Sequence, residues 1–221
     1  MIFKHVFGII TLVTVLLLAG CGNSPETQIY NHLEAAVQLE DNFQKQQDGI
    51  TKLEQEEQGL YKEIIELGIE EMDKIQELTN KAIASIEERS EKIKLEKESL
   101  DASREEFEKS EDLIKEIKDE EVKEKALSMY EAMINRFEAY ETLNKTYNES
   151  LTLEKELYEK FLQEALEEEE LQAHIEKVNL KYQEVIKAND TFNKLTMDYN
   201  ELKKSFYETA EINVKYVESD Q

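Results

Sequence analysis

The sequence predicts an all-α protein, an elongated up-and-down antiparallel bundle of three or four long helices with coiled-coil-like packing. Three observations support this prediction. Glycine and proline, which punctuate strands and turns, occur only six times and once in 221 residues, and neither occurs after Gly68. Glu, Lys, Leu and Ala are abundant, as they are in long helices. Apolar residues also recur at intervals of seven, the spacing at which helices pack side by side.

The chain opens with the layout of a secretory signal peptide, in which a basic start is followed by an apolar run and small residues. Lys4 supplies the charge, Val6 to Leu18 is almost wholly apolar, and Ala19-Gly20 supplies the small residues. The apolar run of 13 residues is shorter than the roughly 20 that a membrane-spanning helix needs. Residues 1–20 are therefore predicted to be a lipoprotein signal peptide that is removed.

Leu18-Ala19-Gly20-Cys21 resembles the bacterial lipobox, in which the cysteine receives a diacylglyceryl group and becomes the first residue. Cys21 is the only cysteine of the chain, so it has no partner for an intramolecular disulfide. Two acyl chains suffice for stable anchoring, whereas one is marginal. We therefore expect lipidation of Cys21, followed by a short tether within residues 21–23. The alternative is an uncleaved membrane anchor with an incidental cysteine.

Residues 24–221 are predicted to form a single acidic helical-bundle domain. Its first helix is expected to begin at Ser24-Pro25-Glu26. Serine is a good N-cap, proline suits the first helical position, and an acidic side chain is favoured at the positive end of a helix.

The breaks between helices are harder to place than the helices themselves. Asp48-Gly49 is the best early turn, and Lys118-Asp119 and the polar run Glu167 to Glu170 each separate two apolar registers. Short turns at these points would make consecutive helices antiparallel neighbours. The segment from Ile50 to Ile117 is either one very long helix or two, with three candidate interruptions at Gly59, at Gly68 and from Ser99 to Ser103.

The clearest apolar register at intervals of seven lies between residues 65 and 117. Its first position is held by Ile65, Met72, Thr79, Ile86, Ile93, Leu100, Phe107 and Ile114. The companion position three residues later is polar at Arg89, Glu96, Ser103 and Ser110. A seam packs well when both positions are apolar. We therefore expect thin coverage from 89 to 110 and faster hydrogen exchange there than from 175 to 202, unless residues 26–48 cover this stretch.

Two further registers predict the C-terminal helices. One consists of Val122, Ala126, Met129, Met133, Phe137, Tyr140, Tyr147, Leu151, Tyr158, Phe161 and Ala165. The other consists of Leu171, Ile175, Val178, Tyr182, Val185, Asn189, Phe192, Thr196, Tyr199, Leu202 and Phe206. Asn189 and Thr196 occupy seam positions, where a buried polar side chain usually fixes the register. A small ligand pocket beside them is the alternative.

The chain is strongly acidic, with a formal net charge of −24. Without residues 1–20, which contain Lys4, it has 26 basic and 51 acidic side chains and a net charge of −25. This charge argues against a nucleic-acid partner, whose phosphates require a basic surface. It also argues against lying flat on anionic lipid. Acidity is expected to keep the protein solvated, and a loose affinity for cations is the alternative.

The sequence contains no recognisable catalytic or metal-binding motif. Di-iron and di-manganese bundles carry Glu three residues before His, whereas Ile29 and Leu171 occupy that position before His32 and His174. There is no clustered zinc-ligand set, EF-hand loop, glycine-rich phosphate loop or serine triad. His174 is expected to flank the core, and Glu167 to Glu170 to form a solvated face or turn. We therefore predict no enzyme activity, no metal and no cofactor.

The lipobox is followed by roughly 200 residues of acidic, tyrosine-containing helix almost free of glycine and proline. This layout resembles the YkyA-like cell-wall-binding lipoproteins of Gram-positive bacteria over the whole chain. Tyr130-Glu131-Ala132-Met133 and Tyr140-Glu141-Thr142-Leu143 add to the resemblance. It implies an up-and-down helical bundle on the outer face of the cytoplasmic membrane, and it supplies no catalytic or binding residues.

Two classes of function remain. The first is a non-enzymatic helical interaction or spacer module at the interface of membrane and cell wall. It would be anchored in membrane lipid through the acylated cysteine and would hold a cell-wall or protein partner. The alternative is a solute- or cation-binding lipoprotein that serves a transporter. Such proteins usually bind their ligand in a cleft between two α/β lobes, and the sequence has no strand pattern, so we favour the first class. The sequence leaves the oligomeric state open.

Overall fold

The computed structural model describes residues 24–163 and 167–214, and these residues form helices and turns but no strand. The predicted signal peptide, Cys21, its tether and Ala165 lie outside the described residues. The helical segments are α1 (Pro25–Leu39), α2 (Asp41–Glu66), the short 3-10 helix η1 (Ile69–Glu71), α3 (Met72–Glu108), α4 (Ser110–Glu116), α5 (Glu120–Phe161) and α6 (Glu168–Thr209).

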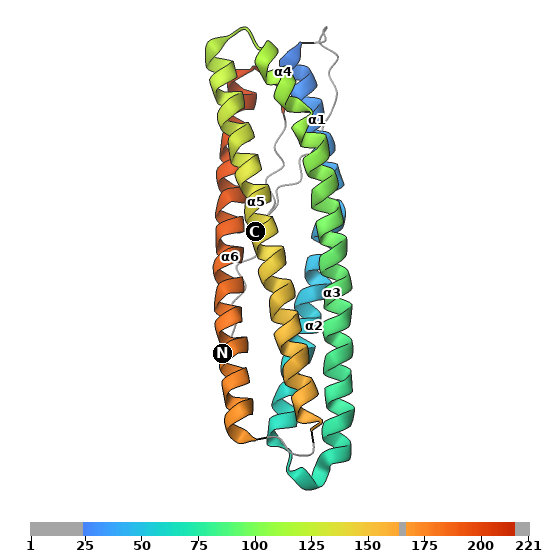
Figure 1. Ribbon diagram of the computed structural model, residues 1–221. Helices are drawn as coiled ribbons and strands as arrows, with labels where there is room; N and C mark the ends of the chain where they lie inside the picture. Colours follow the sequence, from blue (N-terminus) through green and yellow to red (C-terminus); the bar gives the residue numbers. More distant parts are fainter. Residues whose placement is uncertain (1–23, 164–166, 215–221) are drawn as a thin grey trace.

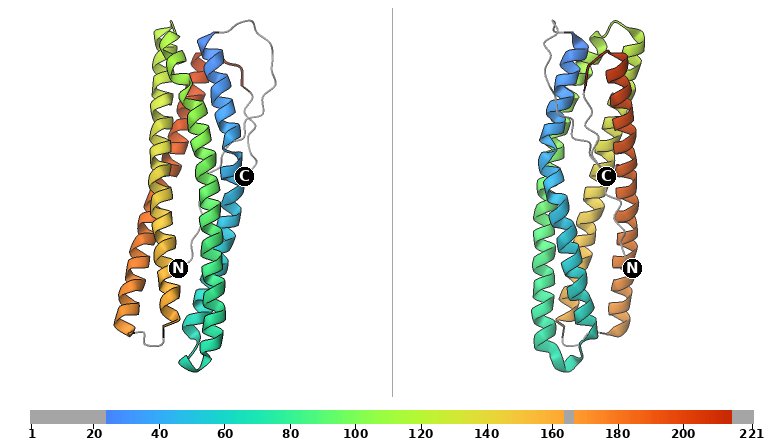
Figure 2. Two further views of the ribbon diagram at one scale, coloured as in Figure 1. Left: turned by 45° about the vertical axis from the view of Figure 1, so that its right-hand side comes forward. Right: turned by 180° about the vertical axis from the view of Figure 1, so that it is seen from behind.

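These segments build four long antiparallel helical rods (Figure 1). Single-residue breaks separate α1 from α2 and α3 from α4, so α1–α4 form a first hairpin and α5 and α6 form a second. Within the hairpins, α2 packs against α3 and α5 against α6 (Figure 2). α5 and α6 each have 42 residues, or about 63 Å at 1.5 Å per residue. The prediction of an elongated all-α up-and-down bundle is confirmed, with four long helices.

The two ends of the bundle carry different helix ends and turns. The proximal end carries the start of α1, the turn from α4 to α5 and the end of α6, and it lies at the top of Figure 1. The distal end carries the turn from α2 to α3, the end of α5 and the start of α6. The chain therefore enters the bundle at the proximal end.

Several helix ends lie where local sequence predicts them. Ser24 Oγ accepts a hydrogen bond from the backbone N–H of Thr27 (3.3 Å), and Pro25 is the first residue of α1. Asp119 Oδ1 accepts hydrogen bonds from two backbone N–H groups at the start of α5, at 2.9 and 3.1 Å. Gly68 interrupts the first hairpin just before η1, and α6 begins within the predicted acidic run. The side chains of Ser24 and Asp119 thus satisfy backbone N–H groups that the start of a helix leaves unpaired.

Other predicted breaks are wrong. Asp48-Gly49 and Gly59 lie within α2, and Ser99 to Ser103 lies within α3. A Cβ atom at Gly49 would lie 3.1 Å from the Lys92 side chain, so this glycine permits a close approach of α3. The break between α1 and α2 falls instead at Glu40, which is not a turn residue but pairs with the second hairpin. The break at Glu40 therefore coincides with a tertiary contact. Local helix propensity alone would continue the helix through this position.

Three apolar clusters fill the bundle. The proximal cluster draws on all four rods and contains Ile29, Leu33, Ala36, Phe107, Ile114, Ile117, Val122, Ala126, Met129, Ala132, Met133, Phe137, Tyr199, Phe206 and Tyr207. The middle cluster contains Phe43, Leu100, Ala139, Tyr140 and Phe192. The distal cluster comes from α2, α3 and α5, with Val185 of α6 packed against its edge.

The predicted register of α3 is confirmed from Thr79 to Ile117, where both seam positions are buried. Ile65 and Met72 are exposed, because the turn between α2 and α3 interrupts the register before it reaches the bundle. The expectation of thin coverage is wrong. The four polar residues of the companion position have at most 2% of their surface exposed: Arg89, Glu96, Ser103 and Ser110.

Residues 26–48, the alternative cover that the sequence allowed, contain the junction of α1 and α2, and this junction covers Ser99 and Ser103. Arg89 is covered by α5 through its pair with Glu154. Ser99 Oγ donates to the backbone oxygen of Leu39 (2.6 Å) and accepts from the backbone N–H of Phe43 (3.1 Å). Ser103 Oγ donates to Glu40 Oε1 (3.0 Å). The polar seam is therefore packed through hydrogen bonds rather than left open, as buried polar groups require.

The register of α6 is buried less completely than predicted. Asn189 is exposed, so its assignment to the seam is wrong, whereas Thr196 is partly buried. Leu180 and Met197 are 60% and 59% exposed. This side of α6 has no neighbouring helix, because α6 packs mainly against α5.

Amide hydrogen exchange should be slower from 89 to 110 than from 171 to 186, although the register alone predicts faster exchange from 89 to 110 than from 175 to 202. The first segment is covered by the α1–α2 junction and α5, whereas the second packs on one neighbour and should open more easily. Mass spectrometry of exchanged peptides would measure this, with peptides from 129 to 140 as the fully packed reference. Equal protection of the two segments would contradict the packing described.

Candidate functional site

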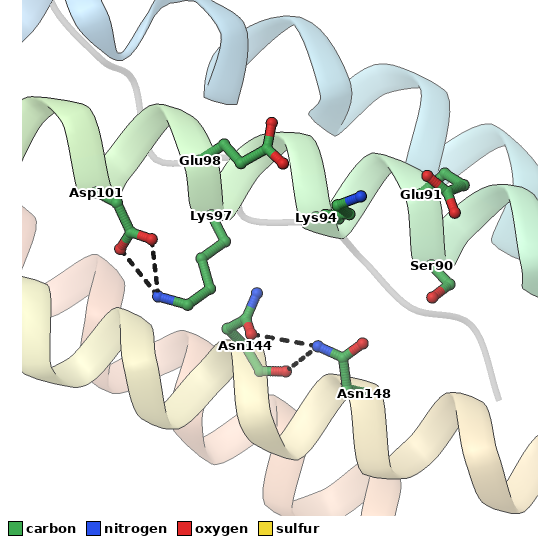
Figure 3. A pocket seen from close by; sticks show the side chains of 8 residues that line it. All are labelled: Ser90, Glu91, Lys94, Lys97, Glu98, Asp101, Asn144 and Asn148. Atoms are coloured by element: carbon green, nitrogen blue, oxygen red, sulfur yellow. Dashed lines mark hydrogen bonds and ion pairs between the residues drawn. The ribbon is translucent and has the colours of Figure 1, made fainter.

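A polar groove lies between α3 and α5, here called the α3–α5 groove (Figure 3). It has a volume of about 380 Å³ and is lined by Ser90, Glu91, Lys94, Lys97, Glu98, Asp101, Asn144 and Asn148. Six of these residues project from successive turns of α3, and the two asparagines project from adjacent turns of α5. The groove therefore follows the line of contact between the two hairpins.

Hydrogen bonds along α5 hold the asparagines of the groove. Asn148 Nδ2 donates to the backbone oxygen of Asn144 (2.8 Å) and to its Oδ1 (3.2 Å). Asn144 Nδ2 in turn lies 3.5 Å from the hydroxyl of Tyr140, which is buried beneath the groove. Both amides are half-buried. These hydrogen bonds hold the two amides in place, and each amide has further donors and acceptors available for a ligand.

Charges of both signs lie along the α3 side. Lys97 Nζ donates to Asp101 Oδ1 (2.9 Å) and, across the groove wall, to Glu141 Oε1 (2.6 Å). Burial alone would lower the pKa of Lys97, but its bonds to Glu141 and Asp101 outweigh burial and raise that pKa. Lys94 is exposed beside Glu91 and Glu98. The groove thus offers amides, ammonium groups and carboxylates, a lining suited to noncovalent contact with a polar, uncharged or zwitterionic ligand.

The interior carries a second polar site at the α1–α2 junction, here called the Glu40–Arg136 clamp. Arg136 Nη1 and Nη2 donate to the two carboxylate oxygens of Glu40, at 2.8 and 2.7 Å. Arg136 Nε donates to Thr196 Oγ1 (3.0 Å), so the clamp joins α5 to α6 and to the first hairpin. Arg136 is 3% exposed. This paired geometry is the strong form of an Arg–carboxylate contact.

A small cavity of about 40 Å³ adjoins the clamp. The hydroxyl of Tyr199 lines it, is buried, and has no hydrogen-bond partner among residues 24–163 and 167–214. Lys203 also lines it, with its Nζ 3.7 Å from Glu34 Oε1. Burial lowers the pKa of Lys203 despite the nearby Glu34 carboxylate. The cavity has room for little more than ordered water. The small ligand pocket that the sequence allowed beside Thr196 therefore corresponds to this cavity.

The two histidines do not form a site. His32 Nδ1 lies 2.7 Å from Glu106 Oε1 at the proximal end. His174 lies near the distal end, where its Nε2 is 2.8 Å from the backbone oxygen of Leu153. His174 is 5% exposed, so the expectation that it flanks the core is wrong. The position of His174 on α6 places its ring against α5, so His174 belongs to the packed interface between these two helices.

Metal chemistry has no support in the described part of the chain. No group of three or more His, Cys, Asp or Glu residues is arranged there to hold an ion. Glu167 to Glu170 are exposed, as expected for a solvated turn, and Glu170 pairs with Lys160. Within the same described residues, no helix is both long and apolar enough to cross a membrane. Cys21 lies before the first described residue.

Comparison with known proteins identifies the family of the chain. The family model YkyA, described as "Putative cell-wall binding lipoprotein", matches residues 24–209. The chain belongs to the YkyA family. It is 34% identical over 201 residues to "Uncharacterized lipoprotein YkyA" of Bacillus subtilis (strain 168), with 90% of each chain covered. The family description names binding and lipid attachment rather than a reaction.

The fold also matches a solved structure. A crystal structure of a conserved protein of unknown function from Staphylococcus aureus aligns with a TM-score of 0.58, covering 86% of this chain and 97% of that one. The two sequences are 11% identical, so the likeness concerns the fold alone. The resemblance seen in the sequence is therefore confirmed for both the YkyA family and the helical bundle.

Sequence reasoning missed both polar sites. Asn144, Asn148 and Lys94 carry no motif, and only the pairing of α3 with α5 brings them together. The polar seam of α3 was a signal for buried hydrogen bonds, because polar residues in seam positions usually set register. What it did not reveal was the partner, since Glu40, which accepts from Ser103, is 63 residues away in the chain.

Replacing Arg136 by Met should lower the free energy of unfolding by about 3–5 kcal/mol, because the Glu40 carboxylate then loses its buried partner. The double variant Arg136→Met/Glu40→Gln should recover much of this loss. Urea unfolding followed by circular dichroism would measure both. Lys194→Met, which breaks an exposed pair with Asp198, is the control and should change stability little. A loss at Arg136 no larger than at Lys194 would exclude the clamp as a stabilising contact.

Proposed function

We propose that this YkyA-family protein is a non-enzymatic spacer and binding module, anchored by lipid on Cys21 and positioned on the outer face of the cell membrane. In this proposal the α3–α5 groove contacts the cell wall. The observation that carries the proposal is the entry of the chain at the proximal end of a four-helix rod. Only Gly22 and Asn23 separate Cys21 from the Ser24 cap, a tether of roughly 10 Å even when extended.

In this proposal, the short tether and the length of the rod would set the distance between the groove and the membrane. The groove residues of α3 lie about 20 positions before the proximal end of α4, or about 30 Å at 1.5 Å per residue. A bundle standing on its anchor would therefore hold the groove about 30 Å from the headgroups and its distal end about twice as far. Repulsion between the acidic rod and anionic lipid supports an upright orientation.

Electrostatics suggests which wall component the groove would contact. Wall teichoic acids are polyanions, and a rod with a net charge of −25 is repelled from them most strongly at low salt, where screening is weakest. The groove itself carries both charge signs and two amides, which suit uncharged or zwitterionic peptidoglycan. A divalent cation would relieve the repulsion from the surrounding polymer.

The alternative, a solute- or cation-binding lipoprotein serving a transporter, is not favoured. Such proteins bind ligands in clefts between α/β lobes, whereas residues 24–163 and 167–214 form a helical bundle without strands. The interior cavity of about 40 Å³ is far smaller than the roughly 300–1,000 Å³ of usual ligand sites. The open groove therefore supports contact with a polymer better than enclosure of a solute.

The first test concerns the anchor. Cys21→Ala should abolish lipid modification and release the protein from the membrane fraction or leave it mislocalised. Without acyl chains, the protein has no strong affinity for the membrane. Cys21→Ser is a conservative second variant with the same expectation. Mass spectrometry of the mature N-terminus decides the question. An unmodified thiol at Cys21 in membrane-bound wild-type protein would overturn the anchoring proposal.

The second test concerns the wall. Residues 22–221 should not sediment with isolated walls in a chelator at low ionic strength, and retention should require millimolar magnesium or calcium. Reversing one groove charge with Lys94→Glu should weaken the cation-supported retention about tenfold, or roughly 1.4 kcal/mol. Lys81→Glu makes the same charge change on an exposed residue of α3 outside the groove, and it should retain wild-type binding.

Other outcomes of the wall assay would change the proposal. Chelator-resistant retention on walls stripped of teichoic acid would replace the cation requirement with direct peptidoglycan recognition. Equal weakening by Lys94→Glu and Lys81→Glu would mean that overall charge, and not the groove, governs retention. Absence of retention under every condition would leave the spacer with a protein partner and would exclude wall contact through this groove.

A further inference from the structure

The distal half of the bundle contains a cluster of charged residues and tyrosines that wall binding does not use, and all of its members are buried except the half-buried Glu54. We call it the distal charge cluster and define it as Glu54 and Glu57 of α2, Arg89 of α3, and Tyr147, Glu154 and Tyr158 of α5. Arg89 is 2% exposed and Glu154 is 1% exposed. The cluster lies at the contact between the two hairpins, so its charge state bears directly on their packing.

The guanidinium of Arg89 is the single cation among the residues of this cluster. Arg89 Nη2 donates to Glu154 Oε2, and it lies 3.9 Å from Glu57 Oε2. One guanidinium therefore faces two buried carboxylates. Arg89 Nε and Glu154 Oε1 have no hydrogen-bond partner among the described residues, so the ion pair satisfies only part of each group.

Tyrosine hydroxyls supply the remaining contacts across the hairpins. Tyr158 donates to Glu57 Oε1, and Tyr147 donates to Glu54 Oε1 at 2.7 Å. Tyr182 of α6 also faces Glu154. A hydroxyl stabilises a carboxylate without neutralising it. Three carboxylates, one guanidinium and neutral phenols thus leave an excess of two negative charges when every carboxylate is ionised.

A further buried carboxylate lies on the same side of α3. Glu96 is 2% exposed, accepts from Gln47 Nε2, and is influenced by the charge of Glu54. No lysine or arginine pairs with it among the described residues. A buried, unpaired carboxylate is costly in its ionised form, so this site too is better filled by a neutral acid.

We propose that the distal charge cluster, together with Glu96, is a proton-binding site that couples the packing of the two hairpins to pH. With protons bound, the excess negative charge is removed and the distal half is closed. When the protons leave, repulsion among carboxylates on α2, α3 and α5 loosens the contact between the hairpins. The ligand of this site is the proton itself, and the inference does not rest on wall binding.

The direction of the pH dependence follows from the environment of each carboxyl. Burial raises the pKa of Glu154 to about 7, although the Arg89 charge opposes it, and burial raises the pKa of Glu96 to about 8. Burial likewise raises the pKa of Glu57. All three values exceed 4.5, the ordinary value for Glu, so the folded chain binds these protons more tightly than the unfolded chain. Their contribution to stability is fully present below that ordinary value and is lost as pH rises through 7 to 8.

Titration of the mature lipoprotein in detergent micelles, labelled with carboxyl-¹³C glutamate, tests the site directly. At least one carboxyl resonance should titrate between pH 6 and 8.5, far above the exposed glutamates. Glu154→Gln should remove one such resonance, and Glu149→Gln is the matched control. Glu149 lies on the same helix, is exposed, and its pKa is lowered by its hydrogen bond to Lys181, so its replacement should leave the high-pH resonances unchanged.

Unfolding by urea supplies the second readout. The urea midpoint of the wild type should fall between pH 6 and 8.5, and Glu154→Gln should reduce this fall, since glutamine mimics the protonated acid. Glu96→Gln, which leaves the Arg89 pair intact, provides the same test if Glu154→Gln does not fold. Absence of any carboxyl titrating above pH 6 would overturn the proposal. An equal loss of stability at both pH values in both variants would also overturn it, because that pattern indicates a purely structural role.

Discussion

The structure depends on one constraint: polar residues placed in the seam of a helical bundle must find their partners on another rod. Glu40 meets this constraint for the middle of the bundle, because its carboxylate accepts from Arg136 and Ser103 at once. The helix breaks at this residue, and Phe43 packs against Tyr140 and Phe192 beyond it. A buried charge pair of this kind is weak evidence for high stability. Its clearer effect is to admit one register of the two hairpins, since a shift by a turn would leave Arg136 unpaired.

The same pattern recurs along the rod and explains how two hairpins recognise each other. Carboxylates on the first rod meet donors on the second hairpin at three further levels, where Glu34 contacts Tyr207, Glu54 contacts Tyr147 and Glu57 contacts Tyr158. Hydrogen bonds also join the rods within the first hairpin, as between Ser103 and Glu40, and contacts between the hairpins combine apolar packing with these carboxylate–tyrosine bonds. Apolar burial supplies most of the driving force, and the ladder of carboxylates selects the alignment. At the proximal end, all four rods also share one apolar cluster.

Sequence reasoning succeeded where the information is local. The scarcity of glycine and proline, the caps at Ser24 and Asp119 and the heptad spacing all reflect interactions within a few residues, and these gave the fold class, several helix ends and most core positions. It failed where a distant partner decides the outcome. Gly49 looked like a turn but serves the close approach of Lys92, and the polar seam of α3 looked exposed because its covering residues lie far away in the chain. The α3–α5 groove was missed for the same reason, since no spacing within one helix reveals that Asn148 and Lys94 line one surface.

The acidic side chains of the chain act differently at the surface and in the interior. Most acidic side chains of the described residues lie on the outer faces, where they keep the rod solvated and repel anionic polymers. A small set is buried, and in the distal half the buried Glu57, Glu96 and Glu154 outnumber the buried cation Arg89. Surface charge acts through a screened, long-range potential and responds to salt. Buried charge is shielded from salt and responds instead to protons, because releasing a proton in the interior leaves charge that solvent cannot stabilise. One composition thus serves two independent purposes: the exterior governs approach to other molecules by ionic strength, and the interior governs the fit between the hairpins by pH.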